Sequence, residues 1–109
     1  MNFKTLGIIP ARIGSSEVKK KNIRLLKGKP LIYYTINAAI NSNLDRVIVS
    51  TDSIEIANIA RTLGAEVPFL RPKFLSGNTS KAIDVVNHTL NWLKIENNWV
   101  PELVGYLQP

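Results

Sequence analysis

The sequence contains no cysteine and only one histidine, His88. Without thiols the chain cannot form a disulfide framework or a thiolate zinc site. A single histidine with no partner pattern around it excludes a Ser-His-Asp triad and a histidine metal cluster. The longest stretch without a charged side chain, residues 30–44, is too short to span a bilayer. Pro10 and Arg12 interrupt the first apolar run before it could serve as a signal peptide, so we expect a cytoplasmic protein with no membrane partner.

Charge is distributed unevenly along the 109 residues, which carry a net +6. Residues 1–29 hold eight basic side chains and one acidic side chain, so this segment carries +7 and residues 30–109 carry −1. One basic segment beside a near-neutral body favours a local anion site. Nucleic-acid binding is disfavoured because no aromatic residue lies between Phe3 and Tyr33 to interleave with the basic side chains.

The apolar pattern predicts one small α/β domain. Hydrophobic residues make up 45% and charged residues 20%, which is typical of a globular chain. Buried strands are expected in four segments: 4–10, 46–51, 66–70 and 103–107. Helices are expected in three segments with an apolar face: 30–42, from Asp52 to Gly64, and 79–96. Strands that alternate with helices predict a mostly parallel sheet with right-handed crossovers.

Local signals predict where these helices begin and end. Pro30 fits the first helical position of the first helix. Asp52, with an acid three residues later, fits the N-cap of the second helix, and Gly64 fits its C-terminal stop. Asn78 or Thr79 is expected to cap the third helix.

The third helix should bury one apolar stripe: Ile83, Val86, Leu90 and Leu93. His88 lies off this stripe and is expected at the surface. Trp92 and Trp99 are expected to serve in packing rather than as platforms for stacking a ligand.

Three polar loops should meet at one edge of the sheet, because ligands of parallel α/β sheets bind at the carboxyl ends of the strands. Segment 11–29 follows the first strand, the loop with Arg71 follows the third, and Gln108 follows the fourth. Segment 11–29 shows neither helical nor strand periodicity, and loops of that length are usually functional or disordered.

The first of these loops has the composition of a phosphate cradle. Gly14 allows close approach of the backbone to an anion, Ser15 offers a hydroxyl and an amide, and Arg12 and residues 19–21 supply positive charge. The P-loop pattern and the dinucleotide fingerprint are both absent. A solvated turn is the alternative interpretation of the lysine run.

The same residues, in this order and spacing, resemble the acylneuraminate cytidylyltransferases (the CMP-sialic acid synthetases), which activate acidic nine-carbon sugars. The resemblance spans nearly the whole chain. Its motifs are residues 8–12, Gly14-Ser15, residues 21–24, residues 28–32, residues 46–52, residues 64–72 and Leu107-Gln108-Pro109.

The resemblance implies a three-layer α/β sandwich with a mostly parallel sheet, of the Rossmann-like nucleotide-diphosphosugar transferase type. Residues 1–109 would be the N-terminal, nucleotide-binding part of one domain whose C-terminal half is absent. The implied reaction transfers CMP from CTP to an acidic nine-carbon sugar and releases pyrophosphate. Mg²⁺ is the implied cofactor, with its ligands in the absent half and none in this chain. A homodimer is implied for the full-length protein, and no activity for this chain alone.

The resemblance also implies roles for single residues. Arg12 and Lys21 would hold the triphosphate and stabilise the leaving pyrophosphate, which makes them the catalytic candidates. Ser15 and Asn22 would contact the phosphates and the ribose or base.

Further contacts are implied for the base and the sugar. The backbone of Pro10 and Ala11 would read the cytosine edge, and Gln108 would face the sugar. The remaining implied nucleotide contacts are Gly14, Arg71, Thr79 and Ser80.

The sequence departs from the family pattern at two places. Ser16 and Glu17 replace a lysine and a glycine, which removes positive charge near the phosphates, and Ala82 replaces a hydroxyl residue. Ile13 and Lys19 replace a glycine and a proline. The alternatives are therefore a weakly active or inactive nucleotide-binding relative, or a member that uses another nucleotide or another acidic sugar.

Overall fold

A computed structural model describes residues 3–12, 25–77 and 81–109. Its strands are β1 (Thr5–Pro10), β2 (Leu25–Leu26), β3 (Lys29–Pro30), β4 (Arg46–Ser50) and β5 (Leu103–Tyr106). Its helices are α1 (Leu31–Ile40), α2 (Ile54–Thr62), the short 3-10 helix η2 (Lys73–Leu75) and α3 (Ala82–Asn97). None of the helices in these ranges is long and apolar enough to cross a membrane.

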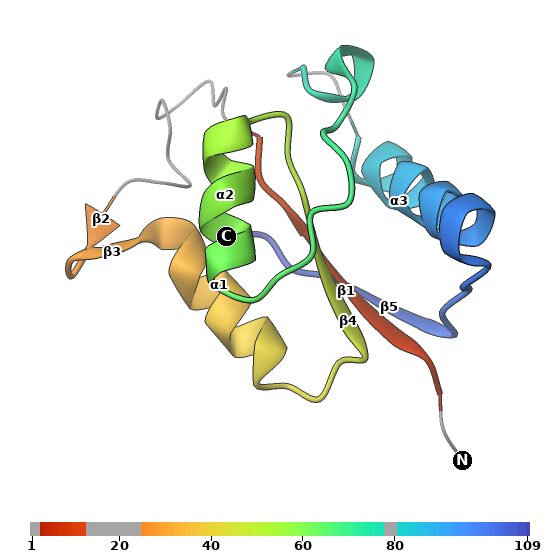
Figure 1. The fold of residues 1–109 in the computed structure, drawn as a ribbon, viewed down its shortest axis with the longest axis horizontal. Helices are drawn as coiled ribbons and strands as arrows, with labels where there is room; N and C mark the ends of the chain where they lie inside the picture. The colour runs from red at the N-terminus through yellow and green to blue at the C-terminus, as the bar shows by residue number, and fades with distance from the viewer. Residues whose placement is uncertain (1–2, 13–24, 78–80) are drawn as a thin grey trace.

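The main sheet has three parallel strands in the order β4-β1-β5 (Figure 1). In its register, Ile8 of β1 lies beside Ile48 of β4 and Tyr106 of β5. Parallel strands with both faces covered favour continuous apolar runs, which explains why β1 and β4 are apolar along most of their length. The expected parallel α/β sheet is confirmed.

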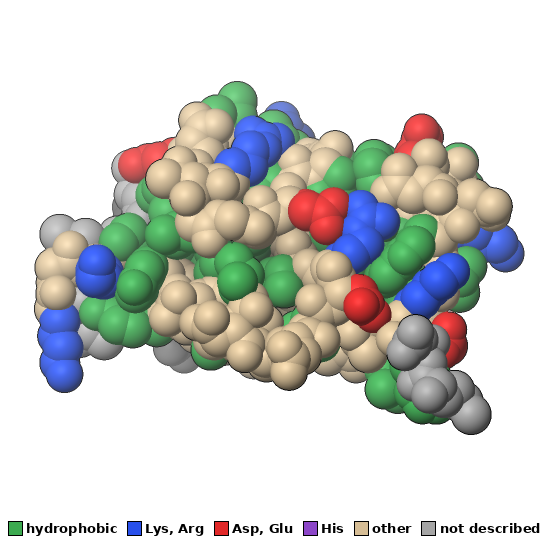
Figure 2. All heavy atoms as spheres, turned by 60° about the horizontal axis from the view of Figure 1, so that its bottom comes forward, with side chains coloured by type: hydrophobic (Ala, Val, Ile, Leu, Met, Phe, Trp, Pro, Cys, Tyr) green, Lys and Arg blue, Asp and Glu red, His purple; other side chains and the backbone are tan. Residues whose placement is uncertain are grey.

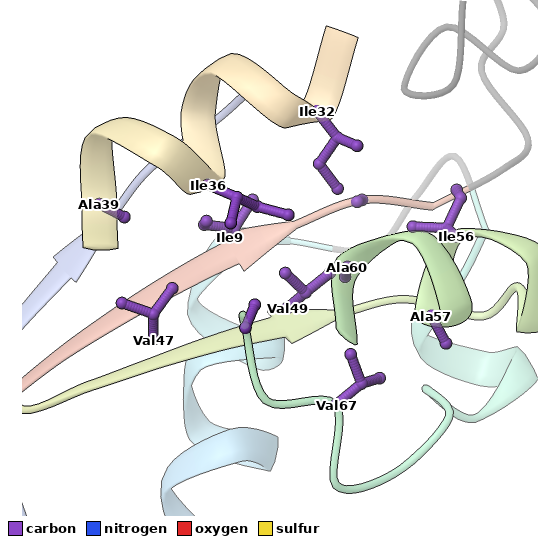
Figure 3. Packing of buried hydrophobic residues seen from close by; sticks show 12 residues of the cluster. Ile9, Ile32, Ile36, Ala39, Val47, Val49, Ile56, Ala57, Ala60 and Val67 are labelled. Atoms are coloured by element: carbon purple, nitrogen blue, oxygen red, sulfur yellow. The ribbon is translucent and has the colours of Figure 1, made fainter. Parts of the chain in front are cut away.

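Helices cover both faces of the sheet, which gives three layers (Figure 1). On one face, Ile36 of α1 and Ile56 of α2 pack against Val49 of β4 (Figure 3). On the other face, Leu93 of α3 packs with Ile8 and Ile48. The two apolar cores hold the strand ends in fixed positions relative to one another.

The expected strand over 66–70 is wrong. Glu66 forms only an isolated parallel bridge with Ile48, in which the Glu66 N–H donates to the Val47 carbonyl and the Val49 N–H donates to the Glu66 carbonyl. Pro68 follows at once and has no N–H to continue a ladder. The chain therefore leaves the edge of β4 and runs as an irregular segment towards η2.

A short antiparallel hairpin, β2-β3, ends the segment that was expected to be wholly irregular. Its turn places Lys27 and Gly28 at positive φ, 52° and 81°. Two successive residues at positive φ are typical of a tight hairpin turn.

Two expectations about where helices begin are also wrong: the cap of α2 and the position of Pro30. Ser53, not Asp52, caps α2, and its hydroxyl oxygen accepts a hydrogen bond from the Ile56 N–H at 3.2 Å. Pro30 stands before the first turn of α1 as its N-cap, with an extended ψ of 143°, rather than in the first helical position. Gly64 follows the C-cap of α2 with φ +99°, as expected.

The third helix begins at Ala82 and Lys81 occupies its N-cap position, later than expected. The predicted caps Asn78 and Thr79 lie outside the described residues. Its buried residues are Val85, Thr89 and Leu93, whereas Ile83 is 59% exposed. Thr89 can be buried because its hydroxyl donates to the Val85 carbonyl, 3.0 Å away. The predicted stripe was therefore partly wrong: Leu93 is buried, and Val86 and Leu90 are half-buried.

An ion pair lies at the amino end of β4, opposite the expected ligand edge. The Arg46 guanidinium donates to both Glu66 carboxylate oxygens, at 2.9 and 2.6 Å, and lies 5.0 Å from the centre of the Trp99 ring. Both tryptophans pack against the α3-side core, as expected. Figure 2 shows this side of the molecule, where acidic and basic side chains are scattered among neutral and apolar ones.

Candidate functional site

The carboxyl ends of the three strands are joined by backbone hydrogen bonds that continue past the sheet. The Ala11 N–H donates to the Ser50 carbonyl at 2.9 Å, and the Leu107 N–H donates to the Ile8 carbonyl at 2.9 Å. The Arg71 N–H donates to the Thr51 carbonyl at 2.7 Å. The segments that follow β1 and β5 and the loop that contains Arg71 therefore lie at one edge of the sheet, as the sequence predicted, and the residues that follow β4 lie among them.

Arg71 is buried at this edge, with 6% of its surface exposed. Its Nε donates to the Ser50 hydroxyl at 3.1 Å, its Nη2 to the Ser50 carbonyl at 2.7 Å, and its Nη1 to the Leu75 carbonyl at 3.2 Å. A buried guanidinium needs such acceptors because desolvating its charge is costly. The side chain fastens η2 to the end of β4.

Several charged groups act on Arg71. Burial lowers the pKa of the Arg71 guanidinium, the Tyr106 hydroxyl and Asp52 oppose that shift, and the positive charge of Arg12 adds to it. Burial also raises the pKa of Tyr106, and Arg71 opposes this. Arg12, Asp52, Arg71 and Tyr106 therefore share one electrostatic environment. Even with the Asp52 carboxylate counted against the two guanidinium groups, this edge of the sheet carries net positive charge, which favours an anionic ligand there.

The predicted site residues that the structure describes all lie at this edge. Ala11 is buried and Arg12 is half-buried, directly after β1. Gln108 is exposed, two residues beyond the end of β5. The other predicted residues lie outside the described ranges: Gly14, Ser15, Lys21, Asn22, Thr79 and Ser80.

The backbone after β1 presents acceptors more readily than donors. Pro10 has no N–H, and the N–H of Ala11 is already donated to Ser50. A ligand that contacts this backbone would therefore meet carbonyl oxygens.

The sequence did not indicate that Tyr106 lies near Arg71 at this edge of the sheet. The expectation that His88 is a surface residue is wrong. His88 is half-buried, and its ring meets the Phe69 ring edge-to-face at 4.6 Å between centroids. Burial lowers the pKa of His88, and Arg71 acts in the same direction. The periodicity of α3 could not reveal this contact, because Phe69 reaches the helix from a distant loop. Tyr106 could have been found from the strand pattern, since it shares a face with Ile8.

The described residues contain no group of three or more His, Cys, Asp or Glu side chains that could hold a metal ion.

Three layers built around a central parallel sheet define a Rossmann-like α/β fold as the structural class. A family model described as Cytidylyltransferase matches residues 6–99. The chain therefore belongs to the cytidylyltransferase family.

Curated relatives carry names that refer to acidic sugars. The CMP-N,N'-diacetyllegionaminic acid synthase of Legionella pneumophila is 49% identical over 77% of this chain and 37% of its own length. The pseudaminic acid cytidylyltransferase of Campylobacter jejuni is 43% identical over 87% of this chain and 41% of its own length. The N-acylneuraminate cytidylyltransferase of Escherichia coli is 40% identical over 84% of this chain and 22% of its own length. The chain thus spans less than half the length of these relatives.

A solved structure supports the fold. The structure of CMP:2-keto-3-deoxy-manno-octonic acid synthetase complexed with CTP aligns with a TM-score of 0.72 and 22% identity. The alignment covers 96% of this chain and 39% of the other chain. The expected nucleotide-sugar transferase fold is confirmed.

Proposed function

We propose that this chain is the nucleotide-binding part of an enzyme that transfers CMP from CTP to an acidic nine-carbon sugar and releases pyrophosphate. The observation that carries the proposal is the pair of guanidinium groups, Arg12 and Arg71, at the carboxyl edge of a sheet within the matched cytidylyltransferase segment. Relatives named for legionaminic, pseudaminic and N-acylneuraminic acids support an acidic sugar as the acceptor.

Charge is the main requirement of this chemistry. As a sugar hydroxyl attacks the α-phosphate, negative charge grows on the departing pyrophosphate, and fixed cations stabilise it. Arg12 would supply such a charge directly after β1, together with Lys21. Arg71, whose side chain already bonds to Ser50 and Leu75, would hold the loop that contacts the nucleotide. Gln108 would meet the sugar at the end of β5.

The backbone after β1 supports cytosine as the base. Carbonyl oxygens at Pro10 and Ala11 would accept hydrogen bonds from the exocyclic amino group of cytosine, whereas uracil has a carbonyl at that position. This arrangement would favour CTP over UTP.

The chain would form only part of the catalytic domain. Strand β5 lies at the edge of the main sheet, with Leu103 58% and Val104 40% exposed. Exposed apolar side chains on a parallel edge strand favour cover by further secondary structure. The matched segment covers only 37% and 41% of the length of two relatives, so these proteins contain further chain that could form such secondary structure. We propose that this additional part provides the Mg²⁺ ligands and the homodimer contacts, and that the 109-residue chain alone releases no pyrophosphate.

A catalytically weak nucleotide-binding relative is the second candidate. The sequence itself favours it at Glu17, where an acidic side chain enters the basic loop in place of a glycine. Such a protein would bind CTP, and a longer form of it would still release little pyrophosphate.

Calorimetric titration of the 109-residue chain with CTP, UTP, GTP and ATP tests the proposal. We expect CTP to bind most tightly and Arg12→Ala to weaken that binding at least about tenfold, as expected for loss of a charged contact. Lys94→Ala is the matched control, since it removes the same charge from the exposed surface of α3. Equal loss in both variants, or equal affinity for all four nucleotides, would contradict the proposal.

A further inference from the structure

Three aromatic rings join helix α3 to the loop that leads into Arg71. Phe69 meets His88 edge-to-face, with 4.6 Å between ring centroids and 85° between ring planes. The Phe69 ring also packs against the Trp92 ring, with 5.6 Å between the ring centroids and 53° between the ring planes. His88 and Trp92 are one helical turn apart on α3, so both rings contact Phe69 from the same face of the helix.

The position of Phe69 limits the position of Arg71, because only Leu70 separates them. The guanidinium of Arg71 then spans from Ser50, at the end of β4, to the carbonyl of Leu75. The loop is thus held at two points, by aromatic packing on α3 and by hydrogen bonds at the edge of the sheet. Loss of the aromatic packing on α3 would therefore allow the Arg71 side chain to move at the edge of the sheet.

His88 suits this role only as a neutral ring. Its Nδ1 is buried and has no hydrogen-bond partner among the described residues. Arg71 is the charged group in these residues that acts on His88, and it opposes a second positive charge. A protonated imidazole would place an unpaired N–H in this buried position beside a guanidinium, which is unfavourable on both counts.

We propose that His88 is a positioning residue for Arg71, acting through its edge-to-face contact with Phe69. The link to nucleotide binding rests on the proposed function. The positioning itself does not, and it can be measured on the free chain.

Hydrogen exchange of the Arg71 Nε–H, followed by NMR on the 109-residue chain, measures the positioning directly. This proton donates to the Ser50 hydroxyl, so its exchange rate reports how firmly the side chain is held. We expect His88→Ala to raise that rate at least about tenfold while the core amides of Ile8 and Val49 change less than about twofold, as for a local opening. His88→Phe should restore slow exchange, because phenylalanine keeps a ring against Phe69. Asn91→Ala, on the exposed surface of α3, is the control and should leave the rate unchanged.

A pH series gives a second readout that a purely structural role would not move. In the wild-type chain, Arg71 exchange, corrected for the intrinsic pH dependence of the process, should increase only as the pH falls well below the ordinary histidine value of about 6.5, because burial lowers the pKa of His88. In His88→Phe that increase should disappear. Unchanged Arg71 exchange in His88→Ala, or acceleration in proportion to the core amides, would overturn the proposal, and so would the same pH response in His88→Phe.

A CTP titration of the same variants separates this proposal from the proposed function. If His88→Ala loosens Arg71 and weakens CTP binding while His88→Phe does neither, both are supported. If Arg71 loosens but no chain binds CTP, the positioning role stands and the proposed nucleotide site is wrong.

Discussion

Replacing Arg71 by lysine tests whether the guanidinium fastens the site loop to the sheet. The change keeps the positive charge but removes the planar fork that reaches three acceptors, two on Ser50 and one on Leu75. A lysine ammonium is a compact charge and would retain one of these acceptors at a time.

The expected cost follows from the lost contacts. Two charge-assisted hydrogen bonds disappear at a site where Arg71 is 6% exposed. Each such bond contributes about 1.5 kcal/mol or more, so we expect Arg71→Lys to lower the free energy of unfolding by about 3 kcal/mol.

Urea denaturation followed by circular dichroism measures that change. Arg61→Lys is the matched control, because exposed Arg61 makes one hydrogen bond to a carbonyl, that of Val67 at 2.7 Å. Its expected cost is below about 1 kcal/mol. Arg71→Lys within about 0.5 kcal/mol of the wild type, or equal to Arg61→Lys, would refute the reasoning.

Three further predictions concern the cap, the histidine and the ion pair. Ser53→Ala should destabilise the chain by about 1 kcal/mol in urea titrations, because the Ser53 hydroxyl provides the cap of α2. Because burial lowers the pKa of His88, the unfolded chain binds more protons than the folded chain at this residue. Its contribution to stability should therefore be greatest above about pH 6.5 and decrease as the pH falls towards the lowered pKa. Thermal melts at several pH values should show a weaker dependence of stability on pH in His88→Phe than in the wild type. A double-mutant cycle of Arg46→Met and Glu66→Gln should give a coupling of about 1 kcal/mol that weakens in high salt, because both side chains are partly exposed.

The sequence predicted the elements whose signals are local. Apolar, β-branched runs marked β1 and β4, and the Gly64 stop and the helical periodicity marked α2. The alternation of these elements then predicted that the polar loops would meet at one edge. That prediction needed no side-chain detail, since parallel crossovers bring all carboxyl ends to the same side of a sheet.

The errors occurred where tertiary contacts decide between similar local options. Asp52 and Ser53 are both good caps, and the path of the backbone after β4 selects Ser53. Segment 66–70 has strand composition, but it leaves β4 after one bridge. The burial of His88 depends on a ring that lies 19 positions earlier in the sequence, a contact that helical periodicity does not encode.

The position of CTP on the chain tests the central claim most directly. Amide chemical-shift changes in the 109-residue chain during CTP titration should concentrate after β1, after β4 and around Arg71, with Ala11 and Thr51 among the affected residues. The amides of Asp45 and Arg46, at the opposite end of β4, should shift little. Changes centred on that opposite end, or spread evenly over the surface, would contradict the assignment of the carboxyl edge as the nucleotide site.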